Sequence, residues 1–210
     1  MKAKKSFLAG IVVSLVAYNY LLNHDLVSKV VFSVALIIIL TMNLNLYTSK
    51  VATILCSNSK IFDKMKNIFV IFFFNALACV IFGYLFSLLG ETHGPEIWAE
   101  KMNSNLAIVF YKSIAVGFLM QIAATCKHDL VTIGVVMLFI GIAGEHSIAN
   151  IAYMSIAGAI SLKGFLYVIY TAIGNAIGSL IIYFLNDDKD KRKVKTDLGA
   201  RRRRLKHEEV

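Results

Sequence analysis

The sequence predicts an all-α integral membrane protein with six transmembrane helices, and two observations carry that prediction. Hydrophobic residues make up 58% of the 210 residues, and the mean hydropathy is +0.68, whereas soluble domains average about 45–50% apolar residues. The apolar residues also gather in blocks, and a helix needs roughly 20 mostly apolar residues to cross a bilayer. Because lipid offers backbone groups no hydrogen-bond partner, long apolar blocks must be helical.

Six apolar blocks follow one another with short polar loops between them. They cover residues 6–22, 27–47, 67–89, 106–125, 130–160 and 165–185. The first block has a charged start like that of a signal peptide, but no small-residue cleavage site follows it. The fifth block is too long and too interrupted for one plain helix. We therefore expect one transmembrane domain over residues 1–185 and a basic tail over residues 186–210.

The basic residues predict the orientation of the chain. If the N-terminus is cytoplasmic, only Lys29, Lys101 and Lys163 fall in outside loops, and Lys112 lies within the fourth block. The positive-inside rule then predicts that both termini lie on the cytoplasmic side. We expect the membrane to be the cell (inner or plasma) membrane. Four arginines at 201–204 could touch anionic lipid or nucleic acid. We interpret them as a solvated topology anchor beside membrane lipid, and we expect no nucleic-acid partner.

An internal repeat relates the third block to the sixth. Residues 75–82 read NALACVIF and residues 175–182 read NAIGSLII. The two blocks are three spans apart, so the halves of the chain would form two inverted three-helix repeats, which usually place a pathway at their interface. Two apolar octets can also look alike by chance.

Polar residues interrupt the second and fifth blocks, which are the middle blocks of the two halves. Residues 43–49 read NLNLYTS and residues 144–150 read GEHSIAN. Irregular backbone at membrane depth is tolerated where it lines a cavity or is buried in protein, and ionisable residues there are functional candidates. We expect broken helices two and five. The alternatives are that Glu145 and His146 only cap a helix, and that the other polar side chains only bond between helices.

Three motifs together resemble the formate/nitrite transporter family. Residues 144–150 resemble its E-H-S-[IV]-A-N signature, and residues 46–49 resemble its L-F-T-[GS] loop with tyrosine in place of phenylalanine. Residues 174–175, followed by small residues, resemble its last-helix motif G-N-x-[IL]-G-G. The resemblance implies an aquaporin-like six-helix fold, a homopentamer with one pore per subunit, and passage of formate, nitrite, hydrosulfide or similar small weak-acid anions.

The resemblance also implies a role for individual residues. The pore histidine would be His146, the polar pore residues Thr48 and Asn175, the constriction Phe32 and Phe139, the anion-attracting residue Lys101, and the supporting motif residues Leu46, Tyr47, Glu145 and Asn150. For the two phenylalanines, ordinary helix packing is the alternative.

The chemistry of these residues suits an anion path. A bare anion in hydrocarbon costs many kcal/mol, and a pore lowers that cost with positive potential and donors or by proton transfer. Lys101 would supply charge at the mouth. Histidine titrates near neutral pH, so His146 can share a proton with a weak-acid anion. The N-termini of broken helices add amide donors.

The sequence gives less support to two other functions, a membrane enzyme and a channel for neutral solutes. A membrane enzyme needs a nucleophile, a metal cluster or paired carboxylates, but Glu145 is the one acid in the blocks. Cys56, Cys79 and Cys126 have no metal-ligand spacing. We therefore expect no enzyme, cofactor or metal. An aquaporin-like channel for small neutral solutes is the closer alternative, although the single proline, Pro95, excludes paired Asn-Pro-Ala motifs.

Three further sequence features bear on the structure: Gly144, Lys112 and a set of small residues. Gly144 stands where a bulky apolar residue is usual in the family, and Lys112 either extends a basic path or pairs at a subunit interface. Small residues at Gly10, Gly117 and Gly178 predict close helix packing.

Overall fold

The computed structural model describes residues 2–126 and 128–208, with side chains up to residue 186. All regular structure in these ranges is helical, in nine helices. Lys127 and the side chains of the basic tail, including the four arginines at 201–204, lie outside the described residues.

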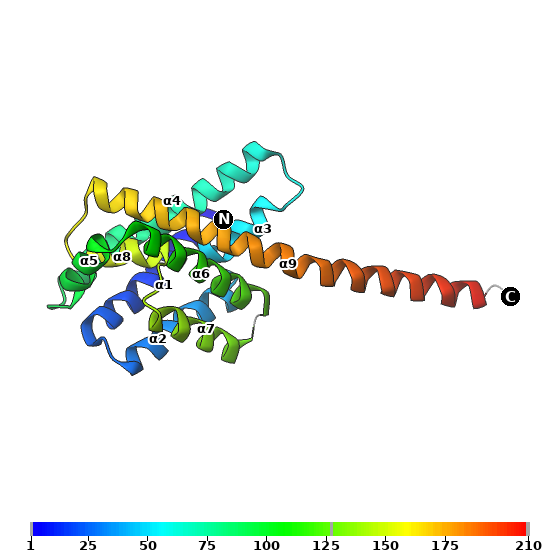
Figure 1. Ribbon diagram of the computed structural model, residues 1–210, viewed down its shortest axis with the longest axis horizontal. Helices are drawn as coiled ribbons and strands as arrows, with labels where there is room; N and C mark the ends of the chain where they lie inside the picture. Colours follow the sequence, from blue (N-terminus) through cyan, green and yellow to red (C-terminus); the bar gives the residue numbers. More distant parts are fainter. Residues whose placement is uncertain (1, 127, 209–210) are drawn as a thin grey trace.

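Four helices are long and apolar enough, by length and composition, to cross a membrane. They are α1 (Lys2–Asn23), α4 (Ile61–Ser87), α6 (Leu106–Cys126) and α9 (Leu162–Glu208), the last counted over Leu162–Asn186. They correspond to the first, third, fourth and sixth apolar blocks of the sequence. Figure 1 shows α9 continuing well beyond the body that the other helices form.

The second and fifth apolar blocks each hold two helices rather than one. The second contains α2 (Leu26–Thr41) and α3 (Tyr47–Leu55), and the fifth contains α7 (Asp129–Gly141) and α8 (Ser147–Ile156). A short helix, α5 (Gly94–Asn103), lies where the sequence predicts a loop. Pro95 suits its first turn, because proline lacks the amide hydrogen that would be unpaired there.

Helices α2 and α7 end in the same way. The N–H of Leu44 donates to the carbonyl of Ile39 over 2.9 Å, and the matching bond at the end of α7 measures 2.7 Å. Asn43 and Ala143 occupy the same place in these turns, and each has φ of 49°. This is the left-handed helix-ending motif that glycine usually provides, and here asparagine and alanine adopt it.

Close packing between α1 and α4, and between α6 and α9, makes the frame of the body. A Cβ atom on Gly10 would come within 2.5 Å of the Asn75 carbonyl oxygen, and one on Gly117 would overlap the Asn175 carbonyl oxygen. A Cβ atom on Gly178 would likewise overlap the Ile114 carbonyl oxygen. The small residues that predict close packing therefore pack within one chain.

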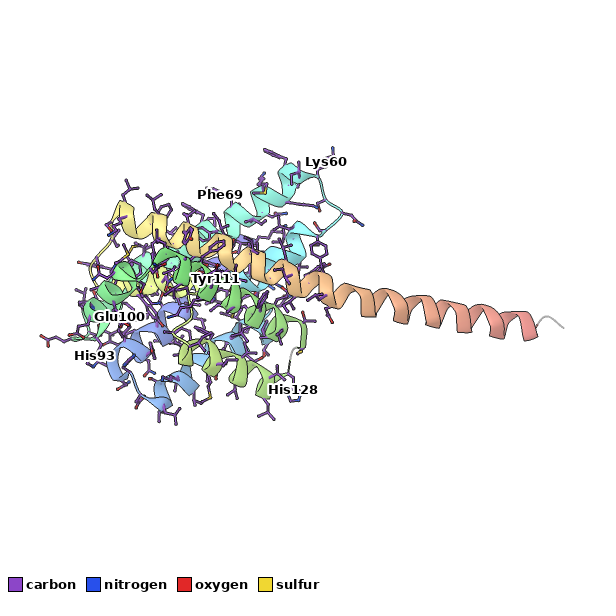
Figure 2. All side chains as sticks on the ribbon, in the orientation of Figure 1. Lys60, Phe69, His93, Glu100, Tyr111 and His128 are labelled. Carbon is purple, nitrogen blue, oxygen red and sulfur yellow. The ribbon has the colours of Figure 1, made fainter. Side chains whose placement is uncertain are left out.

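Polar side chains lie inside the body and many apolar ones lie outside. Thr48, Asn75 and Asn175 are fully buried, whereas Phe69 and Tyr111, both labelled in Figure 2, are largely exposed. A soluble protein would reverse this arrangement. Large exposed apolar surface is typical of a surface that faces lipid or another subunit.

Candidate functional site

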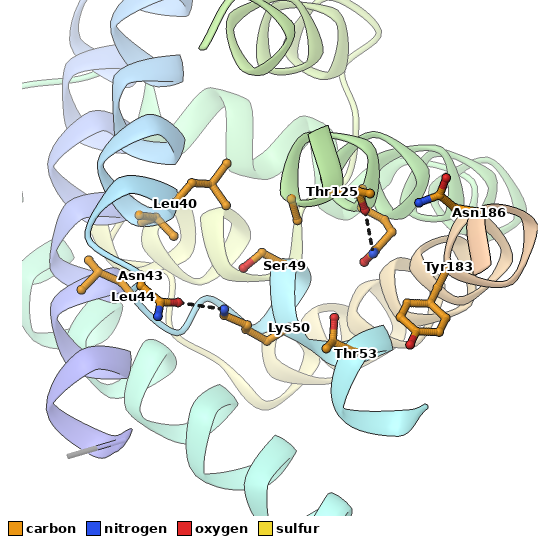
Figure 3. Close-up of a pocket in the computed structure, with 12 residues that line it drawn as sticks. Leu40, Asn43, Leu44, Ser49, Lys50, Thr53, Thr125, Tyr183 and Asn186 are labelled. Carbon is orange, nitrogen blue, oxygen red and sulfur yellow. Dashed lines mark hydrogen bonds between the residues drawn. The ribbon is translucent and has the colours of Figure 1, made fainter. Parts of the chain in front are cut away.

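Three cavities of the body are linked by shared lining residues. The large vestibule, of about 490 Å³, is lined by Asn43, Lys50, Gln121 and other mostly polar residues (Figure 3). The central chamber holds about 20 Å³, and the small vestibule about 120 Å³. Ile39 lines both the large vestibule and the central chamber, and Phe139 lines both the central chamber and the small vestibule. The central chamber therefore shares one lining residue with each of the other two cavities.

Lysines gather at the large vestibule. Lys50 Nζ donates to Asn43 Oδ1 over 3.2 Å, and Lys5 Nζ donates to the Asn43 carbonyl over 3.2 Å. Asn43 follows the C-terminal end of α2, where the helix dipole is negative. The two ammonium groups therefore offset the negative end of this helix beside the cavity.

The central chamber is apolar except for one side chain, His146. Phe32 and Phe139 meet edge to face with ring centroids 5.8 Å apart, and the Phe139 ring stacks on the imidazole at 5.9 Å. The two phenylalanines thus form a single aromatic barrier on the side of the small vestibule. Leu36 and Ile39 also line the chamber, and Ile39 lines the large vestibule as well.

His146 bonds through both of its ring nitrogens. It is the N-cap of α8, where Nδ1 accepts a hydrogen bond from the Ala149 N–H over 3.1 Å. Nε2 lies 2.9 Å from Thr48 Oγ1. Because Nδ1 accepts, the neutral ring carries its hydrogen on Nε2 and donates it to the threonine oxygen. The start of α3 and the start of α8 thereby meet at this bond.

Asn175 holds the backbone on both sides of His146. Its Oδ1 accepts from the Ser147 N–H over 2.9 Å, and its Nδ2 donates to the carbonyls of Glu145 and Ser113, each over 2.8 Å. These bonds satisfy buried backbone groups at the break before α8. Asn175 therefore positions the backbone on either side of His146, and its hydrogen bonds do not go to the imidazole ring.

Asn75 makes the same set of bonds at the other break. Its Oδ1 accepts from the Tyr47 N–H over 2.9 Å, and its Nδ2 donates to the carbonyls of Asn45 and Ser6 over 2.9 and 2.6 Å. Asn75 and Asn175 begin the two octets that resemble each other in the sequence. Each one secures the first residue of a short helix.

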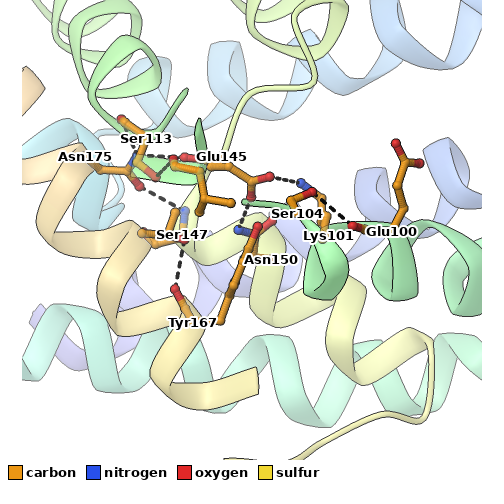
Figure 4. Close-up of polar contacts among 11 residues, drawn as sticks. Glu100, Lys101, Ser104, Ser113, Glu145, Ser147, Asn150, Tyr167 and Asn175 are labelled. Carbon is orange, nitrogen blue, oxygen red and sulfur yellow. Dashed lines mark hydrogen bonds and ion pairs between the residues drawn. The ribbon is translucent and has the colours of Figure 1, made fainter. Parts of the chain in front are cut away.

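A buried ion pair lies beside the small vestibule (Figure 4). Lys101 Nζ is 2.9 Å from Glu145 Oε1, and the two side chains are 13% and 4% exposed. The other carboxylate oxygen accepts from Asn150 Nδ2 over 2.8 Å. The Lys101 ammonium also lies 5.9 Å from the centre of the Tyr153 ring. The charge of Lys101 is therefore compensated by Glu145.

The comparisons with known proteins agree with this geometry. A family model described as formate/nitrite transporter matches residues 3–186. The chain belongs to the formate/nitrite transporter family. It is therefore a multi-pass membrane transport protein and not an enzyme, as the sequence predicts.

Two solved structures share the fold of this family member. An "FNT family ion channel" matches with a TM-score of 0.73 and 18% identity over 86% of each chain. A "Pentameric formate channel with formate bound" matches with a TM-score of 0.70 and 19% identity, over 87% of this chain and 95% of that one. A search of curated proteins finds no match.

The fold of this transporter-family chain brings the sequence-predicted site residues into two groups. Phe32, Phe139, Leu46 and His146 line the central chamber, with Thr48 bonded to the histidine. Lys101, Glu145 and Asn150 form one bonded group at the small vestibule, and Asn175 joins it through the Glu145 carbonyl. Tyr47 points elsewhere, and its hydroxyl donates to the Ala172 carbonyl over 3.0 Å.

Sequence reasoning missed the roles of three residues. Asn75 appeared only as the start of a repeat, although its match to Asn175 was the signal that could have assigned it. Leu36 and Ile39 carry no motif, so nothing in the sequence separates them from other core residues. Among the described residues, no cluster of His, Cys, Asp and Glu side chains could hold a metal ion.

Proposed function

We propose that this chain forms a homopentameric channel in which each subunit passes small monovalent weak-acid anions, namely formate, nitrite or hydrosulfide. The observation that supports it most is the position of His146, the single polar side chain lining an apolar chamber between two vestibules. The pentameric assembly and the anion are proposed by likeness to the formate channel of the same fold. We place it in the cell membrane.

In this proposal six spans form two inverted three-helix repeats with the second and fifth helices broken. The matching bonds of Asn75 and Asn175 support the repeat, and so do the matching turns at Asn43 and Ala143. Both termini are cytoplasmic, the pore domain covers residues 1–185, and residues 186–210 are a basic tail. The large vestibule then faces the cytoplasm and the small vestibule faces outside.

An anion that enters the central chamber meets few polar groups. Because Thr48 accepts the Nε2 hydrogen of His146, the threonine hydroxyl keeps its own hydrogen to offer to the anion. The N-termini of α3 and α8 meet at this point, and their dipoles favour negative charge. These donors are fixed before the anion arrives, so little reorganisation opposes its entry.

A weak-acid anion gains a further route through the chamber. Moving a permanent charge through an apolar cavity is costly, but a weak acid that shares a proton near His146 crosses with less charge. In this role His146 turns its Nε2 hydrogen from Thr48 to the anion, or it takes up a proton from the solution and passes that proton to the anion. Passage should then depend on the external pH and on the pKa of the transported acid.

The size of the central chamber favours small substrates. About 20 Å³ holds roughly one water-sized group, since one water needs at least about 10–15 Å³ by this measure. The Phe32 and Phe139 rings must move aside for anything larger. Rates should therefore fall from hydrosulfide, formate and nitrite to acetate and lactate.

Flux through purified protein in liposomes tests the proposal. Initial rates would be compared for formate, nitrite, hydrosulfide, acetate, lactate and glycerol, with protein-free liposomes subtracted. We expect the three small anions to pass fastest and glycerol to stay at the background rate. Glycerol flux equal to or above formate flux would favour the aquaporin-like channel for small neutral solutes instead.

A further inference from the structure

The small vestibule holds a second lysine, Lys112 of α6, that differs from Lys101. Both side chains line this cavity. Lys101 is paired with Glu145 at 2.9 Å, whereas Lys112 forms no ion pair or hydrogen bond with any residue that the structure describes. Lys112 is half-buried, and partly buried charges are screened less than exposed ones.

The net charge of the small vestibule depends on Lys112. The titratable lysine, glutamate and histidine side chains that line it are His24, Glu100, Lys101, Lys112 and Glu145. With a neutral histidine, the two lysines balance the two glutamates. Without Lys112 the cavity would carry an excess carboxylate and would repel a monovalent anion.

The backbone adds to this need for a cation. Helix α7 ends at Gly141, and Ala143 and Gly144 of the following turn line the same cavity. The C-terminal end of a helix carries partial negative charge. An anion at this mouth therefore faces a helix end and two carboxylates, and only one of the carboxylates is neutralised by a bonded lysine.

We propose that Lys112 is the residue that gathers anions in the small vestibule and sets the apparent affinity of the channel from that side. The inference rests on the proposed anion transport and names a specificity-determining residue for it. Lys101 acts differently, because its charge holds Glu145 in place beside the break before α8. Lys112 concentrates the anion ahead of the Phe32–Phe139 barrier.

The test compares Lys112→Gln with wild type and with Lys163→Gln in liposomes. Lys163 is an exposed lysine at the start of α9 that lines none of the three cavities, so it controls for the loss of one charge. Formate uptake would be measured against concentration at low and high ionic strength. We expect Lys112→Gln to raise the half-saturating concentration about three- to tenfold at low ionic strength, with little change in maximal rate.

Salt and a conservative variant separate an electrostatic role from a structural one. High ionic strength should shrink the defect of Lys112→Gln, because salt screens partly exposed charges, and Lys112→Arg should restore the wild-type value. Equal half-saturating concentrations in Lys112→Gln and Lys163→Gln would overturn the inference. So would a Lys112→Gln protein that changes oligomeric mass, since Lys112 would then serve a subunit interface. Absence of wild-type flux for every anion would overturn the proposed function, and this inference with it.

Discussion

Ala143 adopts a backbone conformation that its Cβ atom disfavours, as His24 and Asn43 also do among the described residues. Its φ of 49° lies in the left-handed region, where a Cβ atom is unfavourable and glycine is at ease. Ala143→Gly should therefore raise stability by about 1 kcal/mol, measured as a higher unfolding temperature in detergent. Ala123→Gly, inside α6, is the control and should lower stability by a similar amount. If Ala143→Gly lowers the unfolding temperature as well, the turn is held by other contacts.

Lys101 and Glu145 should stabilise the fold mainly through their interaction with each other. Lys101→Gln leaves a carboxylate that is 4% exposed without its cation, and breaking such a pair costs about 3–5 kcal/mol. The double variant Lys101→Gln with Glu145→Gln removes both charges and should recover most of that loss. Unfolding temperatures of the four proteins give the coupling. Additive losses in the double variant would mean that the two residues do not stabilise each other.

The breaks before α3 and α8 depend on one asparagine each. Asn75→Ala or Asn175→Ala would leave two backbone groups at each break, one N–H and one carbonyl, without the asparagine as partner, at about 1–3 kcal/mol each. The third bond of each asparagine goes to a carbonyl inside α1 or α6, which keeps its helix bond. We expect both variants to unfold at clearly lower temperatures, and Asn67→Ala, which loses only an exposed bond to Lys2, to match wild type. If either buried asparagine can be replaced without loss, water or another side chain satisfies that break.

The sequence places polar runs where the structure has the gaps between α2 and α3 and between α7 and α8, but it does not show which contacts stabilise those gaps. Polar runs at 43–49 and 144–150 interrupt apolar blocks, and this local pattern is visible along the chain. The Thr48–His146 bond joins residues 98 positions apart, and the Lys101–Glu145 pair joins residues 44 apart. Hydropathy patterns describe neighbours in sequence and carry no information on such contacts. The paired charge of Lys101 and the joint barrier of Phe32 and Phe139 therefore required the structure.

One departure from the family pattern has a direct steric reason. A Cβ atom on Gly144 would lie 2.5 Å from Val116 Cγ2 and 2.7 Å from the Phe139 carbonyl oxygen. A side chain would fit there only if the Val116 side chain and the end of α7 both moved. The sequence shows the glycine, but only the tertiary contact explains why a bulky residue is absent.

At the scale of the whole molecule, the apolar outer surface needs a partner or lipid to cover it. Helix α4 alone exposes Phe62, Phe69 and Phe73, and a pentamer would cover part of such a surface. We expect the purified protein to have a detergent-corrected mass of five subunits by light scattering. A mass equal to one or two subunits in mild detergent would contradict the pentamer and leave the pore within each subunit to be tested separately.

The role of His146 is tested most directly by its replacement with asparagine. Asparagine can still cap α8, as the ring does now through the Ala149 N–H, but it has no proton to share between about pH 5 and pH 8. In liposomes, wild-type formate uptake should rise as the external pH falls, beyond the rise in protein-free liposomes. His146→Asn should keep the fold, lose most of that pH response and change the relative rates of formate and hydrosulfide. If a well-folded His146→Asn protein carries the same anions at the same rates over this pH range, His146 only caps the helix and the proposed mechanism is wrong.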